Sequence, residues 1–336
     1  MTLNLEQIKS VTQGAEVVEQ ENGIVKFYRF TKEEQAIYAK TVFYEKTFAT
    51  AGVKMEFETD GKFLSFSVIT KPATSRSFFS ADVFVNEKLV SHCANFTIEE
   101  MQGDYTNKSF ALGEYTFNVD LGEGNKRIKI IFPWSVCMQL KEIRLANATY
   151  IRSVNKTKKM LVYGDSITNG YDAKYTSNAY VTQVANAFDL EIHNKAIGGE
   201  VFFPALSKAK RNLSPDYVLV SYGSNDWGFK TQEDFVFRCK EFFKNLTVNY
   251  PNSLIFAISP IWRADLECER QFGPFYEVEK RLREICGEYE NVKVISGWAF
   301  VPQDKNLFSD LRLHPNDEGF KYYAENLIKE MRKYIL

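Results

Sequence analysis

The chain has 336 residues, of which 45% are hydrophobic and 25% are charged, and its formal net charge is −1. This composition is typical of an ordinary soluble protein, and the length predicts two domains rather than one. No block of basic residues is present that could follow a phosphate backbone, which argues against a nucleic-acid partner.

The sequence indicates neither a membrane segment nor a framework of disulfides or metal ligands. No apolar run approaches the roughly 20 residues that cross a bilayer. Residues 1–6 lack the basic and apolar regions of a secretory signal. The 5 cysteines are scattered, odd in number and without a Cys-x-x-Cys pair. We therefore expect a cytoplasmic protein that binds no membrane and uses no metal or cofactor.

Residues 1–150 are predicted to form an all-β domain. Apolar and polar residues alternate in short stretches, and Asp60-Gly61 is a dipeptide typical of the hairpin turn between two of them. One helix is expected over residues 31–40, with Thr31 as its N-cap. The spacing of strands and turns predicts a sandwich or jelly roll. The predicted strands span residues 25–30, 53–58, 63–69, 81–85, 115–121, 127–132 and 142–146.

A polar and basic stretch, residues 151–159, is the expected junction with a second domain. From residue 160 onward, buried apolar runs alternate with amphipathic segments, which is typical of a parallel sheet covered by helices on both faces. We therefore predict a three-layer α/β domain over residues 158–336. Its strands are expected at residues 160–163, 190–194, 217–222, 254–258 and 292–295, and its helices at 178–188, 232–249, 275–289 and 316–336.

The first strand of this domain ends at Gly164-Asp165-Ser166. A serine at this point lies at the carboxyl edge of the sheet, beside backbone N–H groups that the start of a helix leaves unpaired. Such donors can hold a developing oxyanion, so Ser166 is a candidate nucleophile. The alternative is that Asp165 and Ser166 only cap the following helix.

Two further loops are expected to meet Ser166 at this edge, because parallel strands end together. Residues 194–199 carry Gly198 and Gly199, which let backbone N–H groups approach a ligand closely. Residues 222–227 carry Asn225, whose amide adds a side-chain donor. Together these donors would surround the Ser166 hydroxyl as acyl transfer requires.

His314 is the candidate general base among the 3 histidines. It stands where Pro315 opens the final helix, and an imidazole fixed there can take and return the serine proton. Asp310 is the candidate carboxylate that fixes its tautomer. His92 lies in the β-rich half and His193 within a predicted strand, where structural roles are expected. The alternative is that Asp310 and His314 merely cap the last helix.

These residues resemble the SGNH (GDSL-type) hydrolases over about residues 158–336. The resemblance implies a flavodoxin-like sheet and a serine esterase or deacylase. By position it makes Ser166 the nucleophile and His314 the general base. It also assigns the oxyanion hole to the Ser166 N–H, the Gly199 N–H and the Asn225 side chain, with Gly198 as the alternative glycine. The four blocks, in the family's order, are Gly164-Asp165-Ser166, Gly199, Gly223-Ser224-Asn225-Asp226 and His314-Pro315.

One departure from the family's pattern concerns the third member of the triad. The family usually places its aspartate three residues before the histidine, where this chain has Leu311. Asp310 lies four residues before His314, and we expect it to complete the triad because one loop residue can re-aim a carboxylate. The alternative is a Ser–His dyad with a backbone carbonyl orienting the imidazole.

The β-rich half followed by this domain is similar in architecture to carbohydrate esterase family two, where a jelly roll precedes an SGNH domain. That similarity implies an O-acetylated sugar as substrate. Trp227 and Trp262 then become candidates for flanking the sugar, although packing is the alternative for both. Asp226 and Arg263 are expected to pair and support the loop.

The leading hypothesis is therefore a metal-independent esterase acting on short acyl esters, with acetyl groups on a small molecule or oligosaccharide as the expected substrate. Two alternatives stay open: a non-catalytic carbohydrate-binding protein and an esterase for lipid-like esters. A nucleotide site is disfavoured because residues 164–170 match neither G-x-G-x-x-G nor the P-loop spacing. A homo-oligomer is compatible with the sequence.

Overall fold

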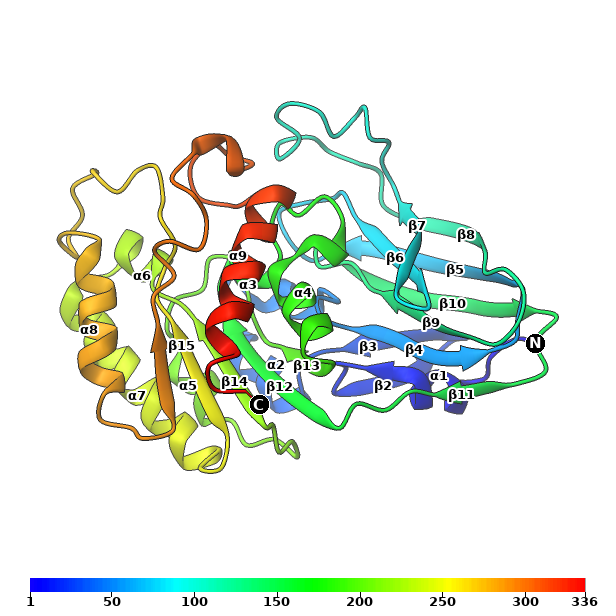
Figure 1. Ribbon diagram of the computed structural model, residues 1–336, viewed down its shortest axis with the longest axis horizontal. Coiled ribbons are helices and arrows are strands. Elements are labelled where there is room, and N and C mark those ends of the chain that lie inside the picture. The colour runs from blue at the N-terminus through cyan, green and yellow to red at the C-terminus, as the bar shows by residue number, and fades with distance from the viewer. Residues whose placement is uncertain (336) are drawn as a thin grey trace.

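The computed structural model describes residues 1–335, whose strands form two antiparallel sheets and one parallel sheet. The antiparallel strands come from the N-terminal half of the chain and the parallel strands from the C-terminal half (Figure 1). The predicted α/β domain with a parallel sheet, preceded by a β-rich half, is therefore confirmed.

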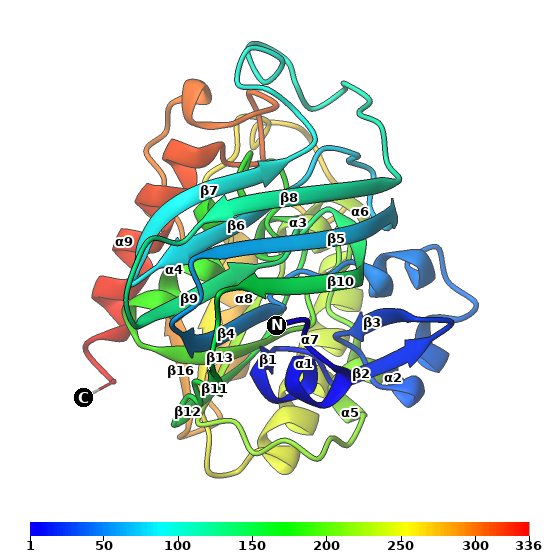
Figure 2. The ribbon, with the colours of Figure 1, turned by 90° about the vertical axis from the view of Figure 1, so that its right-hand side faces the viewer.

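The two antiparallel sheets pack over one apolar core. Phe57 of one sheet and Leu64 and Phe66 of the other are buried in it, and Figure 2 looks onto these strands with the helices of the C-terminal half behind them. The first sheet has the order β2 (Val17–Glu21), β3 (Ile24–Tyr28), β10 (Val136–Ala146), β5 (Phe63–Pro72), β8 (Glu114–Asp120). The second has the order β1 (Thr12–Gln13), β4 (Lys54–Thr59), β9 (Lys126–Ile131), β6 (Ser80–Val85), β7 (Lys88–Ala94), with β11 (Ile151–Ser153) on β4.

The predicted helix near residue 31 is present, but it is not alone in this half. α2 (Lys32–Tyr38) begins at the capping box of Thr31 and Glu34. α1 (Leu5–Val11) was not predicted, although Asn4 and Gln7 form a capping box of the same kind. A short 3-10 helix, η1 (Tyr44–Phe48), follows α2.

The parallel sheet has the order 2-1-3-4-5 of a flavodoxin-like fold. All neighbouring strands are parallel, and β12 lies between β13 and β14. In this arrangement ligands bind at the carboxyl ends of the strands, where the strand order changes direction. The strands, in spatial order, are β13 (Leu190–Asn194), β12 (Lys158–Gly164), β14 (Tyr217–Ser221), β15 (Leu254–Ile258) and β16 (Val292–Ile295).

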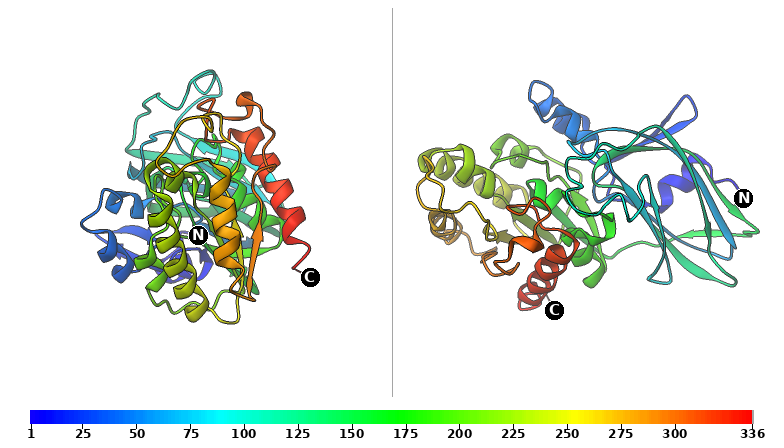
Figure 3. Two further views of the ribbon diagram at one scale, coloured as in Figure 1. Left: turned by 90° about the vertical axis from the view of Figure 1, so that its left-hand side faces the viewer. Right: turned by 90° about the horizontal axis from the view of Figure 1, so that it is seen from above.

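Helices cover both faces of this sheet, as the continuous apolar strands predict. Leu161 of β12 packs in one cluster with α7 and α8, while Met160 and Val162 pack in another with α4 and α9, and Figure 3 shows these helices on either side of the strands. The helices of this half are α3 (Ser166–Asn169), α4 (Tyr180–Ala187), α5 (Pro204–Lys208), α6 (Ser224–Phe229), α7 (Gln232–Asn249), α8 (Tyr276–Cys286) and α9 (Asp317–Met331), and the 3-10 helices are η2 (Thr176–Asn178) and η3 (Lys305–Leu307).

The two halves are joined by buried contacts. Phe30 and Tyr38 of the β-rich half belong to the apolar cluster that covers the parallel sheet. The buried Arg29 guanidinium donates hydrogen bonds to the carbonyl oxygens of Asn194 (2.9 Å) and Ala196 (2.8 Å), just beyond β13. None of the helices formed by residues 1–335 is both long enough and apolar enough to span a membrane.

Candidate active site

Ser166 lies where β12 ends and α3 begins. Gly164 is required at the strand end, because a Cβ atom there would lie 2.3 Å from Thr168 Oγ1 and 2.8 Å from the Ser221 carbonyl oxygen. Asp165 is the N-cap of α3, and its side chain accepts a hydrogen bond of 3.0 Å from the Ile167 N–H. Since Asp165 fills the capping role, the Ser166 hydroxyl is not needed for it.

The Ser166 hydroxyl instead contacts His314. Ser166 Oγ lies 2.9 Å from His314 Nε2, and His314 Nδ1 lies 2.9 Å from Asp310 Oδ2. With Nδ1 protonated toward the carboxylate, Nε2 is free to accept the serine proton. The sequence-predicted Ser166, His314 and Asp310 are thus brought together in one chain of hydrogen bonds.

Asp310 is held in its ionised form. Burial disfavours the charge, but hydrogen bonds and attraction from His314 outweigh burial, and the pKa of Asp310 lies well below its usual range. Its Oδ1 also accepts hydrogen bonds from the backbone N–H groups of Leu313 (2.7 Å) and His314 (3.1 Å).

The four-residue spacing between Asp310 and His314 is accommodated by one loop residue. Leu311, at the position where the family usually has its aspartate, adopts a left-handed conformation with φ of 53° and is 59% exposed. This conformation is costly for a residue with a side chain, and it turns the chain so that Asp310 reaches the imidazole.

A second carboxylate, Asp172, also faces His314 and was missed by the sequence analysis. Asp172 Oδ2 lies 3.7 Å from His314 Nδ1. Arg76 of the β-rich half binds this carboxylate through two hydrogen bonds of 2.7 and 3.2 Å, and Ser309 Oγ donates a third of 2.7 Å. Neither its position after the Gly164-Asp165-Ser166 block nor its spacing marks Asp172 in the sequence.

The predicted oxyanion-hole residues line the same cavity as Ser166 and His314. Gly199 has φ of 88°, and a Cβ there would be in ordinary contact with Phe43 (3.6 Å) and Lys46 (3.8 Å), whereas a Cβ on Gly198 would lie 2.6 Å from the Tyr171 ring. Asn225 lies in the first turn of α6, and its Nδ2 donates one hydrogen bond of 3.0 Å to the Glu200 carbonyl oxygen. An amide nitrogen carries two hydrogens, so Asn225 has a second donor to offer.

The cavity has a volume of about 380 Å³, and both halves of the chain build its wall. Lys46 and Ser75 come from the β-rich half, so this half takes part in forming the cavity. The lining residues are Lys46, Ser75, Ser166, Tyr171, Gly198, Gly199, Ser224, Asn225, Gly228, Phe229, Arg263, Arg270, Arg312, Leu313 and His314.

Three buried acids lie behind this wall. Burial raises the pKa of Glu200 to about 8, although hydrogen bonds from the Tyr222 and Tyr38 hydroxyls (2.6 and 2.5 Å) oppose the rise. Burial likewise raises the pKa of Asp226 to about 7 and that of Asp165 to about 6. Glu200 directly follows Gly199, so its protonation state bears on the oxyanion-hole loop.

The two tryptophans expected to flank a sugar do not line the cavity. Trp227 is only 1% exposed, and its Nε1 donates a hydrogen bond of 2.9 Å to the Gly273 carbonyl oxygen. Trp262 packs against the Phe308 ring at 5.5 Å beside the apolar core. The substrate-binding expectation for Trp227 is therefore wrong, because its side chain is buried, while Trp262 is partly buried and lies outside the lining of this cavity.

The expected pair of Asp226 and Arg263 is also not formed. Arg263 binds Asp265 and the Ser224 carbonyl oxygen, while Asp226 accepts a hydrogen bond of 3.2 Å from the Phe202 N–H. No group of three metal-ligating side chains was found within residues 1–335.

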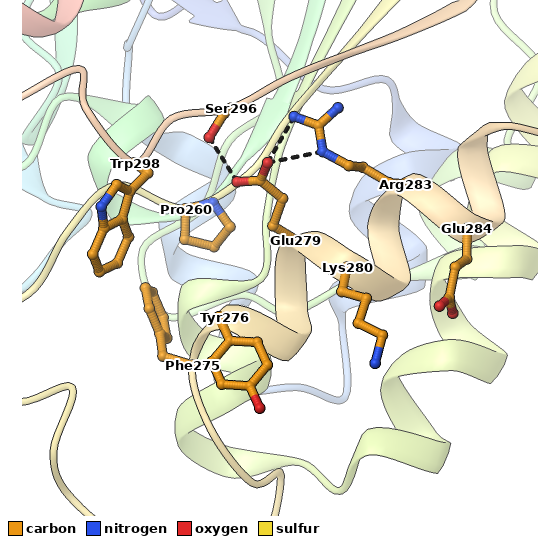
Figure 4. A pocket seen from close by; sticks show the side chains of 9 residues that line it. All are labelled: Pro260, Phe275, Tyr276, Glu279, Lys280, Arg283, Glu284, Ser296 and Trp298. Carbon is orange, nitrogen blue, oxygen red and sulfur yellow. Dashed lines mark hydrogen bonds and ion pairs between the residues drawn. The ribbon is translucent and has the colours of Figure 1, made fainter.

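A second hollow of about 680 Å³ lies beside α8, at the carboxyl end of β16 (Figure 4). Phe275, Tyr276 and Trp298 form much of its wall. Its central carboxylate, Glu279, is already bound by Ser296, Ser259 and Arg283. The residues that line this hollow include no histidine, so the candidate active site is the cavity beside Ser166 and His314.

Comparisons with known proteins identify the family of part of the chain and relatives of its fold. Residues 162–322 match the GDSL-like lipase/acylhydrolase family. No match was found among curated proteins. Three solved structures share the fold over nearly the whole chain. A salicylyl-acyltransferase from a tetracycline biosynthetic pathway has a TM-score of 0.78 at 20% identity, covering 96% of this chain and 94% of that one.

The other two structures are carbohydrate-active enzymes. A family two carbohydrate esterase from Cellvibrio japonicus has a TM-score of 0.66 at 15% identity, covering 99% of this chain and 97% of that one. An acetyl xylan esterase from Butyrivibrio proteoclasticus has a TM-score of 0.64 at 14% identity, covering 99% of this chain and 98% of that one. At these identities the likeness concerns the fold, which includes the β-rich half. Residues 162–322 of the chain thus form a domain of the GDSL-like lipase/acylhydrolase family.

Proposed function

We propose that the protein is a serine esterase that hydrolyses short acyl esters, with O-acetyl groups on carbohydrate as the expected substrate. The observation that carries this proposal is the continuous contact from Ser166 Oγ to His314 Nε2 and from His314 Nδ1 to Asp310 Oδ2, each 2.9 Å long. Binding alone does not require such a proton path, which favours an enzyme over a non-catalytic carbohydrate-binding protein.

In this mechanism Ser166 Oγ attacks the ester carbonyl carbon while His314 Nε2 takes its proton. The carbonyl oxygen becomes an oxyanion, to which the Ser166 N–H, the Gly199 N–H and the Asn225 amide would donate hydrogen bonds. His314 then gives the proton to the leaving alcohol, and the acyl group stays on Ser166. Water then attacks the acyl carbonyl carbon while His314 Nε2 takes its proton. The proton returns to Ser166 Oγ as the carboxylic acid leaves. Asp310 orients the imidazole and stabilises its protonated form.

The size and lining of the cavity support a short acyl group. A volume of about 380 Å³ lies near the lower end of the 300–1,000 Å³ range of small-molecule sites. The large apolar side chains in its wall are few, and Phe229 is 73% exposed at the surface. A long acyl chain would need a continuous apolar channel, so lipid-like esters are disfavoured.

A carbohydrate substrate is supported by the fold of the whole chain. Similar structures include an acetyl xylan esterase and a family two carbohydrate esterase in complex with cellohexaose. We also propose that the antiparallel half is the predicted jelly roll, since the orders β3-β10-β5-β8 and β4-β9-β6-β7 pair strands in the manner expected of one. Its contribution of Lys46 and Ser75 to the cavity supports a part in substrate binding.

The test is ester hydrolysis by the wild type and the Ser166→Ala variant. The substrates are p-nitrophenyl acetate, butyrate and octanoate, together with acetylated xylo- and manno-oligosaccharides. We expect acetyl esters to be cleaved best and all turnover to be lost in Ser166→Ala. Ser10→Ala, on the exposed face of α1, is the matched control and should behave as wild type.

Each other outcome has a defined meaning. A preference for octanoate would keep the serine mechanism and move the substrate toward lipids. Turnover that survives in Ser166→Ala would refute the nucleophile. Absence of any Ser166-dependent turnover, combined with glycan binding by the full chain, would favour the carbohydrate-binding alternative.

A further inference from the structure

The cavity that holds Ser166 is lined by four cationic side chains and, within residues 1–335, by no carboxylate. Lys46 comes from η1 in the β-rich half. Arg263 and Arg270 belong to the loop that follows β15, and Arg312 lies between the two triad residues Asp310 and His314. Segments far apart in the sequence therefore each place a positive charge at one cavity.

Asp265 is the carboxylate that these arginines share. It binds Arg263 through two contacts, Nε to Oδ1 at 2.5 Å and Nη2 to Oδ2 at 2.8 Å. Its distances to Arg270 Nη2 and Arg312 Nη1 are longer, 3.6 and 3.5 Å. Arg263 is buried and also donates to Ser224. Asp265 is thus matched by Arg263, which has a structural role, and Arg270 and Arg312 are left without a full counter-charge.

The side chain of Arg270 has one buried donor without an acceptor. Its guanidinium lies over the Trp227 ring, 5.1 Å from the centroid. Its Nε is buried and has no hydrogen-bond partner in the described part of the chain. A guanidinium that served only to fix the loop would be expected to direct these donors to carbonyl or carboxylate oxygens.

Lys46 adds a third charge on the side of the oxyanion-hole loop. Its Nζ donates a hydrogen bond of 2.6 Å to the Gly198 carbonyl oxygen. It lies 3.8 Å from the position that a Gly199 Cβ would occupy. No ion pair within residues 1–335 includes Lys46, whose partner is therefore a neutral carbonyl.

The small size of the cavity makes these charges act together on any occupant. A sphere of the cavity's volume is about 9 Å across, which is close to the screening length of about 8 Å at physiological ionic strength. A negatively charged substrate is therefore attracted by Lys46 and by Arg270 and Arg312, whose charges Asp265 balances only in part, and a positively charged one is repelled. The planar fork of a guanidinium also fits the paired oxygens of a carboxylate or phosphate.

We propose that the ester cleaved at Ser166 carries a negative charge, a carboxylate or a phosphate, which Arg270 and Arg312 bind while Lys46 adds to the attraction. This inference rests on the proposed esterase function and narrows its substrate to an acylated acidic compound, such as the acetyl ester of an acidic sugar. The bond broken is the ester bond of the mechanism above, and the anionic group takes no part in the chemistry.

The test compares esters that share one acetyl group and one aromatic ring. The substrates are 4-acetoxybenzoate, 4-acetoxyphenyl phosphate and the neutral methyl 4-acetoxybenzoate. We expect kcat/KM of the wild type to favour an anionic ester over the neutral one by about tenfold or more at low salt, as hydrogen bonds to charged groups allow. The preference should fall as salt is added. The better of the two anions identifies the charged group.

The variants are the single Arg312→Met and the double Arg270→Met/Arg312→Met. The Arg312 side chain is 52% exposed, so it can be replaced without disturbing the core. The quantity compared is the ratio of anionic to neutral kcat/KM, which should fall severalfold in the single variant and to about one in the double variant. Arg332→Met is the matched control and should keep the wild-type ratio. Arg332 follows α9, whose 15 residues place it about 22 Å from the helix start beside His314.

The outcomes separate this inference from the function on which it rests. Suppose that the neutral ester is cleaved in a Ser166-dependent way and that the anionic-to-neutral ratio of kcat/KM is the same in the wild type and the double variant. This result overturns the proposal of an anionic substrate and leaves the esterase function standing. If no ester is cleaved, the esterase proposal fails. Titration calorimetry with 4-hydroxybenzoate on Ser166→Ala then decides the anion site: binding lost with Arg270 and Arg312 supports it, and no binding overturns it.

Discussion

The buried carboxyl of Glu200 should make the stability of the protein depend on pH in a way that one substitution removes. Burial raises its pKa from an ordinary value of 4.5 to about 8. Between these two pH values the folded protein holds a proton that the unfolded chain has lost. The contribution of Glu200 to the free energy of unfolding is therefore fully present below pH 4.5 and is lost as pH rises through 8.

The size of this effect follows from the same interval. Each pH unit corresponds to 1.36 kcal/mol, so the interval (8 − 4.5) × 1.36 amounts to about 5 kcal/mol, of which about 4 kcal/mol falls between pH 5 and pH 8. Glu200→Gln cannot ionise and keeps an oxygen for one of the two tyrosine hydroxyls. We expect its free energy of unfolding to fall less steeply with pH than that of the wild type.

The assay is urea unfolding followed by tryptophan fluorescence at pH 5, 6, 7 and 8. The free energy of unfolding of Glu200→Gln, measured relative to that of the wild type, should rise by several kcal/mol from pH 5 to pH 8. Glu325→Gln, at an exposed position of α9, is the control and should run parallel to the wild type. Parallel curves for Glu200→Gln as well would refute the assignment of a raised pKa to this carboxyl.

Activity offers an independent readout of the same group. Glu200 follows Gly199, and its carbonyl oxygen holds the Asn225 amide. Ionisation near pH 8 would place a negative charge next to the oxyanion and slow acyl transfer. Turnover of Glu200→Gln should therefore decline less above pH 8 than that of the wild type, and identical alkaline limbs would contradict this.

Three further predictions concern the site itself. Asn225→Ala should lower kcat about a hundredfold or more with little change in stability, because it removes an oxyanion donor; a wild-type rate would exclude that role. Asp310→Ala should lower kcat/KM about a hundredfold. Adding Asp172→Asn should lower kcat/KM about a further tenfold, because the second carboxylate lies 3.7 Å from His314 Nδ1. An unchanged kcat/KM on adding Asp172→Asn would show that Asp172 does not assist. Gly198→Ala should reduce both the melting temperature and the rate, because its Cβ would lie 2.6 Å from the Tyr171 ring, which stacks on the His314 imidazole; wild-type values in thermal unfolding and esterase assays would contradict the packing argument.

The parts of the fold that the sequence predicted well are those with strong local periodicity. The helix expected over residues 232–249 is observed as α7 with the same bounds, because its apolar residues recur on one face and Thr231 caps its start. α1 has only 7 residues and was missed, since so short a helix shows little periodicity. β10 is longer than expected, because its first half is buried on both sides and lacks alternation.

The candidate residues Ser166, Gly199 and Asn225 were predictable because each lies in the segment that follows a strand of the parallel sheet. Strand ends converge at one edge of a parallel sheet, so Ser166, Gly199 and Asn225 could be placed together. Asp172 and Arg270 could not, because each reaches the site from a loop whose path no local pattern determines. The error at Trp227 has a simple cause: residues two apart on a helix point to different faces, so a neighbour of Asn225 need not face the cavity.

The buried Arg29 ties the loop that follows β13 to the β-rich half of the chain. Its guanidinium satisfies carbonyl oxygens at Asn194 and Ala196, on the loop that leads to Gly199, and those acceptors would face water in a fragment that began at residue 158. A chimaera that exchanges one half of the chain should therefore keep Arg29 on one side and the carbonyl oxygens of residues 194 and 196 on the other.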